Sequence, residues 1–354
     1  MLVTAGSAPP RGRVAPAART RAMRLHAFGE PPRPVTLARP VPTGQEVLLR
    51  VLATAVDLHD VAAAAGLLPG VHLPAVLGHA VSGEVVAAGP DVCAPAPGTP
   101  VAVHGAWGCG VCALCRAGEE QLCARPRWCG SGAAGGFAEH LLVPHARHLV
   151  ELGGLDPGLA APLAGEGLWT YRAVRRCLDR LVPGTAAVVL GAGVAGQMAV
   201  QMLKALSAVH VIAVDPDPRH EAAARESGAD AFVRELDAEA VYEALAHRPA
   251  VAVLDLEGSD AGVALGAALV APQGRVVATG LGLGRLAWSP ATVAPEAMLS
   301  TTRWGSRSDL VEVLALARAG RIFVRTDRHP LEHAPAALLA VEEGGVDGSA
   351  VLVP

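Results

Sequence analysis

Four cysteines in one short segment constrain this chain more than any other feature of its sequence. Cys109, Cys112, Cys115 and Cys123 follow the spacing C-x2-C-x2-C-x7-C. Four thiolates this close together can surround one Zn²⁺ as a tetrahedron with no open position, which is the form of a structural zinc site. The alternative is a set of reduced thiols without a metal, which the fit of the spacing to one tetrahedron disfavours.

The composition indicates a large protein with well-filled cores. At 354 residues the chain is long for one core, so two domains are expected. It is 51% hydrophobic, and its net charge of −4 gives no electrostatic reason to expect nucleic acid or an anionic membrane as a partner. No uninterrupted apolar run is long enough to span a bilayer.

The other three cysteines, Cys93, Cys129 and Cys177, do not extend the cluster into a disulfide framework. Reduced thiols beside a metal site are typical of a cytoplasmic protein, and we expect that location.

Residues 1–22 differ from the rest of the chain. They contain four arginines, no acid and three prolines. An organelle transit peptide is also rich in arginine, but the prolines would interrupt its amphipathic helix. We therefore expect a disordered tail or a start assigned too early, with Met23 as the true beginning.

The order of apolar runs predicts two kinds of domain. From 23 to 144 short β-like runs are broken by Pro and Gly, which indicates a compact, barrel-like β domain. Residues 156–181 are helical in pattern. Strands are then predicted at 186–190, 209–214, 251–254 and 275–279, with helices at 196–206, 220–227, 262–270 and 309–319. Strands that alternate with helices indicate a parallel sheet covered by helices.

A dinucleotide-binding motif follows the first of these predicted strands. Gly191, Gly193 and Gly196 form G-x-G-x-x-G, with Val194 and Ala195 between the last two glycines. The glycines allow a tight turn and close approach of a pyrophosphate to the N-terminus of the next helix. Asp215 ends the next strand, where a carboxylate accepts the ribose hydroxyls of NAD and repels a 2′-phosphate.

Two alternatives to this NAD site remain open. The motif alone could be a glycine-rich turn, although the strand, the helix and the distal acid are all in place. Arg219 lies close enough to Asp215 in the sequence to leave NADP as a less favoured alternative.

The cysteine segment and this motif together resemble the zinc-containing alcohol dehydrogenases of the medium-chain dehydrogenase/reductase superfamily. The resemblance implies a GroES-like catalytic domain at 23–162 and 306–354, and a Rossmann domain, a doubly wound parallel sheet, at 163–305. It also implies hydride transfer between NAD(P) and a small alcohol or carbonyl substrate, a second, catalytic zinc, and a homo-oligomer, dimer or tetramer. The blocks that carry it, besides the two motifs, are 73–79 (LPAVLGH), 135–139 (GGFAE), 143–144 (VP) and 344–354.

The catalytic zinc site departs from the family pattern. The family histidine is kept as His79, but its first cysteine ligand falls on Asp57 and its third ligand on Gly165, beside Glu166. Asp57, His79 and Glu166 could together hold a zinc ion if Glu166 reaches the third position. The alternative is that His79 is only hydrogen-bonded in the cleft and that the two acids lie there without a metal.

These alternatives predict different chemistry. A zinc ion would polarise the substrate oxygen as a Lewis acid. Without it the site needs a proton donor, and His59, at the family's Ser/Thr relay position, is the sequence's candidate because histidine titrates near neutrality. Asp57, His59 and His79 are thus the candidate catalytic residues, while Asp60 is expected to have a structural role.

The leading hypothesis is an NAD-dependent oxidoreductase of the alcohol dehydrogenase type. The alternatives are a reductase of enones or carbonyls without catalytic zinc, and a nucleotide-binding relative that has lost catalysis.

Overall fold

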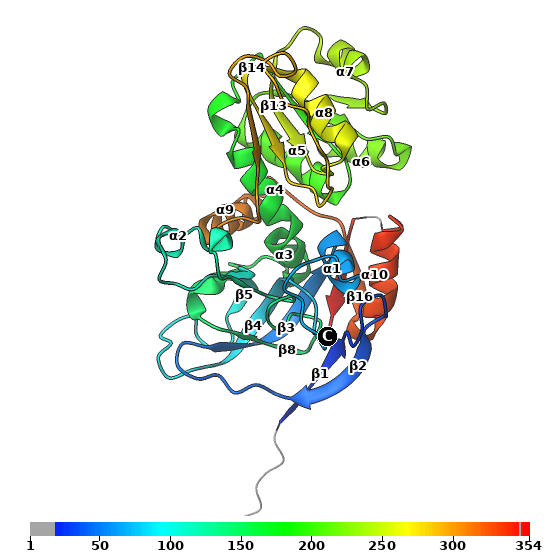
Figure 1. Cartoon of the computed structure of the whole chain (residues 1–354). Coiled ribbons are helices and arrows are strands. Elements are labelled where there is room, and N and C mark those ends of the chain that lie inside the picture. Colours follow the sequence, from blue (N-terminus) through cyan, green and yellow to red (C-terminus); the bar gives the residue numbers. More distant parts are fainter. Residues whose placement is uncertain (1–17, 347) are drawn as a thin grey trace, which may run out of the picture.

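The computed structural model describes residues 18–346 and 348–354 and contains two large sheets. Figure 1 shows them one above the other, with α4 (Glu166–Arg175) and α9 (Arg307–Arg318) between the two halves. Among the described residues, no helix combines the length and the apolar character needed to cross a membrane.

The lower half is built on a seven-stranded sheet. Its strand order is β16-β17-β3-β4-β5-β9, and β8 also pairs with β3. The bounds are β3 (Val47–Val56), β4 (Ala80–Ala88), β5 (Pro100–Val103), β8 (His140–Val143), β9 (Leu149–Glu151), β16 (Thr326–Pro330) and β17 (Ser349–Val353). The helices of this half are α1 (Leu58–Ala64), α3 (Pro157–Ala164) and α10 (Ala334–Glu342).

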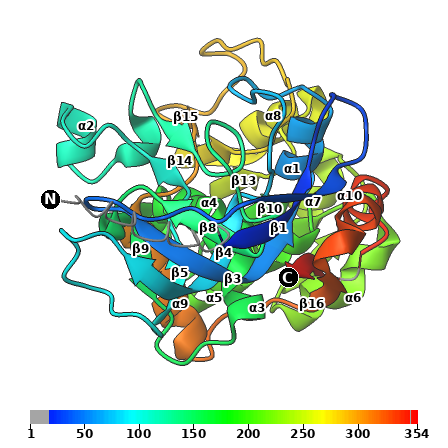
Figure 2. The ribbon, with the colours of Figure 1, turned by 90° about the horizontal axis from the view of Figure 1, so that it is seen from below.

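The last strand of the chain completes this sheet. β17 pairs antiparallel with β3, with Ala350 opposite Val56, and parallel with β16. Helix α10 packs against α1, and the two lie side by side in both views (Figures 1 and 2). The end of the chain therefore returns to the half in which the described chain begins, as the family resemblance implied.

The upper half is a parallel sheet with helices on both faces. Its order is β12-β11-β10-β13-β14-β15, and every neighbouring pair is parallel. The strands are β10 (Ala186–Leu190), β11 (His210–Val214), β12 (Ala231–Val233), β13 (Ala250–Asp255), β14 (Val270–Ala278) and β15 (Met298–Thr301). The helices are α5 (Val194–Leu206), α6 (Glu221–Glu226), α7 (Ala238–Leu245) and α8 (Asp260–Leu269).

Strand β10 shows why helices cover both faces of this sheet. All five of its residues are buried. Ala187 and Val189 belong to one hydrophobic core, while Val188 and Leu190 belong to another on the opposite face. A continuous apolar run is what a parallel strand between two helix layers requires. The predicted fold class, a β-rich unit joined to a doubly wound parallel sheet, is confirmed.

Smaller elements complete the fold. β6 (Ala106–Trp107) and β7 (Arg127–Trp128) pair at the base of a lobe that contains α2 (Ala113–Arg116). Figure 2 shows α2 at one side of the molecule, away from α10. The 3-10 turns are η1 (Glu120–Leu122), η2 (Ala146–His148), η3 (Leu178–Arg180), η4 (Pro218–His220) and η5 (Leu331–His333).

The expectation for the N-terminal segment is wrong in part. Strand β1 (Arg19–Arg24) pairs antiparallel with β2 (Arg33–Ala38) over its whole length. Thr20 and Ala22 are buried in this strand, so residues 19–22 are not a disordered tail. Apolar contacts of Ala22 with the core favour order that the local composition alone does not predict. Residues 1–17 lie outside the described residues.

A buried carboxylate fixes the junction between the two halves. Asp309 forms a capping box with Ser306 at the start of α9. Its side chain is fully buried and is bound by Arg172, at 3.1 Å, and by Arg175, both from α4. The charges compensate one another, and α4 and α9 are held together where the chain passes from one half to the other.

Candidate active site and zinc lobe

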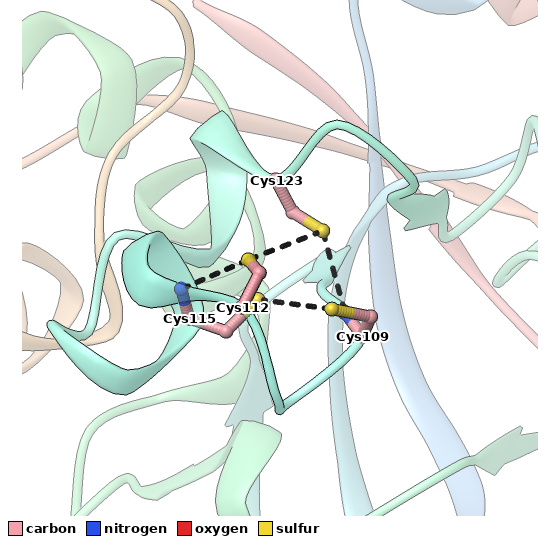
Figure 3. Close-up of side chains that lie close together, drawn as sticks. All are labelled: Cys109, Cys112, Cys115 and Cys123. Atoms are coloured by element: carbon pink, nitrogen blue, oxygen red, sulfur yellow. Dashed lines mark hydrogen bonds between the residues drawn. The ribbon is translucent and has the colours of Figure 1, made fainter.

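The four clustered cysteines meet in the lobe between β6 and β7. Figure 3 shows their sulfur atoms converging. The Sγ atoms of Cys109 and Cys115 are 4.0 Å apart, as are those of Cys112 and Cys123, and all four lie within 4.8 Å of one another. Zn–S bonds of about 2.3 Å place the sulfurs of a tetrahedral site about 3.8 Å apart. The lobe thus presents a closed four-thiolate set at zinc spacing.

Backbone amides donate hydrogen bonds to the sulfur atoms of two of these cysteines. The amide of Cys109 and that of Arg125 donate to Cys123 Sγ, at 3.5 and 3.4 Å, and the amide of Cys115 donates to Cys112 Sγ at 3.5 Å. Hydrogen bonds from backbone amides lower the pKa of Cys109 to about 6, whereas burial raises the pKa of Cys115 to about 12. A metal would be expected to deprotonate all four, because coordinated thiols bind as thiolates.

The loop after β10 has the form of a nucleotide-binding turn. Gly191 has a φ of +91°, which favours glycine, and a Cβ at Gly196 would lie 2.1 Å from the carbonyl oxygen of Gly191. A Cβ at Gly193 would meet nothing within 4 Å, so the space before α5 is open. No side chain caps α5, and its first amides are therefore available to a pyrophosphate.

Asp215 is bound into this loop. Its Oδ2 accepts from the amide of Ala192 at 2.7 Å and contacts His220 Nδ1 at 2.9 Å, while its Oδ1 accepts from the amide of Asp217 at 2.8 Å. Burial alone would raise the pKa of Asp215, but these hydrogen bonds hold the pKa below its usual value. The carboxylate is thus charged and fixed beside the glycine loop, where the residues fit an NAD ribose.

Arg219 is the residue for which the sequence left NADP as an alternative cofactor, and it forms an ion pair with Asp217. Its guanidinium binds the carboxylate of Asp217, and both groups lie at the surface. His220, which the sequence did not single out, instead lies next to Asp215. Its spacing of five residues from Asp215 becomes meaningful only once the turn η4 is formed.

The second site is centred on His79, directly before β4. Its Nε2 lies 3.1 Å from Asp57 Oδ2, and its Nδ1 lies 3.2 Å from Asp60 Oδ1. The second contact has the distance of an ion pair but not the geometry of a hydrogen bond. All three side chains are buried. Helix α1 positions the two acids, because Asp57 is its N-cap and Asp60 completes the capping box.

This arrangement favours the charged form of His79. Burial alone would lower the pKa of the imidazole, but the carboxylates of Asp57 and Asp60 raise it well above its usual value. Conversely, burial would raise the pKa of Asp57, but His79 holds it low. Asp60 has the structural hydrogen-bonding role expected of it, since its Oδ1 accepts from the amide of Gly78 at 3.1 Å, and it also faces the ring nitrogen of His79 opposite Asp57.

The pKa of His59 differs from the near-neutral value expected from the sequence. Its ring lies 4.7 Å from that of His79, centroid to centroid, and 5.9 Å from that of Trp304. Burial, reinforced by the charge of His79, lowers the pKa of His59 to about 4. The expectation that it titrates near neutrality is therefore wrong, because the imidazole stays uncharged at neutral pH.

Trp304 was not predicted as a site residue. It is buried, with its ring 5.0 Å from that of His79 and 5.8 Å from that of Trp128. Its φ of +55° is a costly conformation for a bulky side chain and occurs at sites where the surrounding structure imposes it. Nothing in the local sequence signals this, since Trp304 meets His79 only through the fold.

The expected catalytic zinc ligands are only partly brought together. A Cβ at Gly165 would lie 3.5 Å from His79 Nε2 and 3.7 Å from Asp57 Oδ2, so the position faces both atoms but has no side chain. The group of metal-binding type around His79 consists of Asp57, Asp60 and His79, and Glu166 is not part of it. Asp57 and Asp60 face opposite nitrogens of the His79 ring, at Nε2 and Nδ1, and an imidazole binds one ion through only one nitrogen. His79 and Asp57 would thus supply two of the three ligands that a catalytic zinc takes, so the residues present do not fit that metal.

Glu166 instead has the character of a neutral acid. It is the first residue of α4, directly after Gly165, and no hydrogen bond joins its carboxyl group to another side chain in the part of the chain that is described. Burial, followed by the charge of Asp57, raises the pKa of Glu166 to about 8. The site therefore holds a carboxylic acid that is mostly protonated at neutral pH, beside an imidazolium and two carboxylates.

Comparison with known proteins matches both halves of the chain to known families. Residues 43–153 match the family described as "Alcohol dehydrogenase GroES-like domain", and residues 194–319 match "Zinc-binding dehydrogenase". An NAD-dependent alcohol dehydrogenase of Sulfurisphaera tokodaii is 35% identical over 348 residues, 94% of this chain and 100% of the relative.

Other relatives lead to the same family. A D-arabinose 1-dehydrogenase (NADP(+)) of Saccharolobus solfataricus is 30% identical, covering 95% of this chain and 98% of the relative. The solved alcohol dehydrogenase of Aeropyrum pernix is 31% identical, with a TM-score of 0.87, covering 94% of this chain and 100% of that chain. The chain therefore belongs to the zinc-containing alcohol dehydrogenase family of the medium-chain dehydrogenase/reductase superfamily.

Proposed function

We propose that this protein is an NAD-dependent oxidoreductase that interconverts small alcohols and carbonyl compounds without a catalytic zinc. The observation that carries the proposal is the nucleotide-binding loop at 191–196, with Asp215 beside it, together with Glu166, which follows the position that faces His79 and Asp57 and whose pKa burial raises to about 8. When bound, the nicotinamide takes up or supplies the hydride. The proton must then come from or go to a side chain.

Glu166 is the group we assign to that proton. In carbonyl reduction, its carboxyl proton moves to the substrate oxygen as the carbon receives the hydride, and the product is an alcohol. The carboxylate left behind takes up a proton from solvent before the next turnover. Alcohol oxidation uses the same steps in reverse, with Glu166 accepting the proton. A carboxylic acid with a pKa of about 8 is suited to both directions near neutral pH.

The other residues support this step electrostatically. The imidazolium of His79, held between Asp57 and Asp60, stabilises negative charge that develops on the substrate oxygen. His59 is uncharged, and we assign it a hydrogen bond to the substrate rather than proton transfer. The ring of Trp304 packs against both histidines and limits access of water.

The proposal is tested by assaying the purified protein with NAD or NADH and a panel of alcohols, ketones, aldehydes and enones. We expect NAD-linked turnover of at least one alcohol–carbonyl pair. Reduction of enones alone, at the carbon–carbon double bond, would instead support the zinc-free enone reductase. Tight NADH binding with turnover of no compound would contradict the proposal and favour the non-catalytic relative.

Asp215→Ala should weaken NAD binding by about 10- to 100-fold, because a charged acceptor of the ribose hydroxyls is lost. NADP binding should fall less, so the preference for NAD over NADP decreases. Steady-state kinetics with both cofactors measures this, and Asp327→Ala at an exposed acid is the matched control. An unchanged NAD/NADP ratio in Asp215→Ala would rule out the role assigned to this carboxylate.

We also propose a homo-oligomer, dimer or tetramer, of cytoplasmic location. β15 is the last strand in the order of the upper sheet, and the segment leading to it exposes Leu281, Leu283 and Trp288, with exposed fractions of 53%, 93% and 69%. Exposed strand edges beside apolar side chains favour association. Light scattering on the purified protein should give two or four times the mass of one chain, and a single-chain mass would contradict the proposal.

The division into domains at 23–162, 163–305 and 306–354 stays a proposal as well. The distribution of the two sheets supports it, since β10 to β15 all lie within 163–305.

A further inference from the structure

A second group of metal-binding side chains lies beneath the cysteine lobe. His104 follows β5, Glu120 begins η1, and His148 ends η2, directly before β9. All three are buried, and one ligand atom from each lies within 4.8 Å of the others. The amide of His104 donates to the carbonyl of His148 at 2.8 Å, so the two histidines are held on adjacent backbone segments. None of these residues belongs to the sites described above.

The hydrogen bond of His104 fixes which of its nitrogens is free. Its Nε2 lies 2.8 Å from the carbonyl oxygen of Gly305, which can only accept, so Nε2 carries the proton. Nδ1 then has a lone pair, and it is buried without a hydrogen-bond partner among the described residues. An orphaned buried nitrogen is costly unless a further group satisfies it. Metal-binding histidines commonly donate their other ring nitrogen to a carbonyl in this way.

Glu120 and His148 lie at the distance of an ion pair but do not form a hydrogen bond. Glu120 Oε2 lies 3.2 Å from His148 Nδ1, but this nitrogen, too, is buried without a partner of hydrogen-bond geometry. The other oxygen, Oε1, is held by Arg147 Nε at 2.8 Å, and Arg147 also donates to the carbonyl of Gly108. Bonds of about 2.0–2.1 Å to a tetrahedral zinc place neighbouring ligand atoms about 3.3 Å apart. The observed contact has the spacing of two ligands of one ion.

We propose that His104, Glu120 and His148 bind a divalent transition metal, zinc by ligand type. Two imidazoles and one carboxylate form a set that zinc accepts, with a fourth position left for water. One ion would give a partner to the unbonded Nδ1 atoms of His104 and His148. It would also bind Oε2 of Glu120, whose other oxygen is held by Arg147.

The position of this site suggests a structural role. Glu120 lies in the lobe between Cys115 and Cys123, whereas His104 and His148 flank strands of the lower sheet. An ion bound by all three would fasten the lobe to that sheet. Through the Gly305 carbonyl it would also be connected to the segment that precedes α9.

Metal analysis of the full-length protein tests the proposal. After chelation and reloading with excess Zn²⁺, we expect two zinc ions per chain, one from the cysteines and one from the new site. Glu120→Gln and His104→Asn should each retain only one. Asp57→Asn is the matched control, and it should retain two, because the residues around His79 do not complete a zinc site.

Cobalt distinguishes the two ions by their ligands. Co²⁺ bound to the cysteines gives a thiolate charge-transfer band, whereas Co²⁺ at the new site should add only weaker ligand-field bands, which Glu120→Gln removes. A wild-type chain that retains a single ion in excess metal would overturn the proposal. So would a second ion that persists in folded Glu120→Gln or that is lost in Asp57→Asn. Circular dichroism establishes folding, and Glu120→Gln serves if His104→Asn does not fold.

Discussion

Glu166→Gln should lower carbonyl reduction by about 10²- to 10⁴-fold, because the proposed proton donor is replaced by an amide of the same shape. The effect should appear in kcat, while the KM for NADH changes little, since the nucleotide loop is separate. Single-turnover kinetics of hydride transfer measures the loss. Glu151→Gln, at an exposed glutamate, is the matched control and should retain wild-type turnover.

The pH profile provides a second test of Glu166. The reactive form in reduction is protonated, so the wild-type rate should fall as pH rises through about 8, while alcohol oxidation should rise over the same range. Glu166→Gln should lack this titration. A profile that is unchanged in Glu166→Gln would contradict the assignment. Loss of a bound zinc ion in that variant would instead support Glu166 as a metal ligand, as the sequence first allowed.

The same raised pKa predicts an effect on stability. The folded pKa of about 8 exceeds the usual value of 4.5, so between these pH values the folded state binds more protons than the unfolded state. Stability from this group is fully present below about 4.5 and is lost as pH rises through 8. Urea unfolding at several pH values should therefore show Glu166→Gln gaining stability relative to the wild type as pH increases.

Cys112→Ser should remove the zinc ion of the lobe and lower the melting temperature by about 10 °C. The estimate takes a loss on the order of 5 kcal/mol, below the roughly 10–16 kcal/mol with which zinc-finger peptides bind zinc, and about 2 °C per kcal/mol for a chain of this size. Calorimetry and metal analysis on the same samples measure both effects. The loss follows because Cys112 both supplies one of four sulfurs and caps α2.

Cys93→Ser is the control for this change. Cys93 is an exposed free cysteine outside the lobe, and its substitution should leave both the melting temperature and the metal content unchanged. A Cys112→Ser protein that retains its full zinc content and melts with the wild type would show that the cysteines do not hold a structural metal.

The sites that could be predicted from the sequence are those whose residues lie close together in the chain. The four cysteines span 15 positions, and the glycine motif leads directly into one helix, so spacing alone fixes their geometry. Asp215 was predictable because the next strand of a parallel sheet ends at the same edge.

The active site was only partly predictable, because its electrostatics arise between distant segments. The family resemblance located Asp57, His79 and Glu166, but not their protonation. His59 is uncharged because His79 and Trp304 pack around it, and Asp60 faces His79 across 19 positions of sequence. His104, Glu120 and His148 follow no local spacing at all, and only the pairing of β5 with β9 brings the two histidines together.

The pairing of β17 with β3 has a consequence for how the protein is made. The upper sheet uses only strands from one continuous stretch of chain, so it can fold as soon as that stretch has left the ribosome. The lower sheet cannot, because β3 pairs with β17, which follows all strands of the upper sheet in the sequence. The half that carries His79 therefore keeps an unpaired strand edge until a segment that follows the whole upper half has been synthesised.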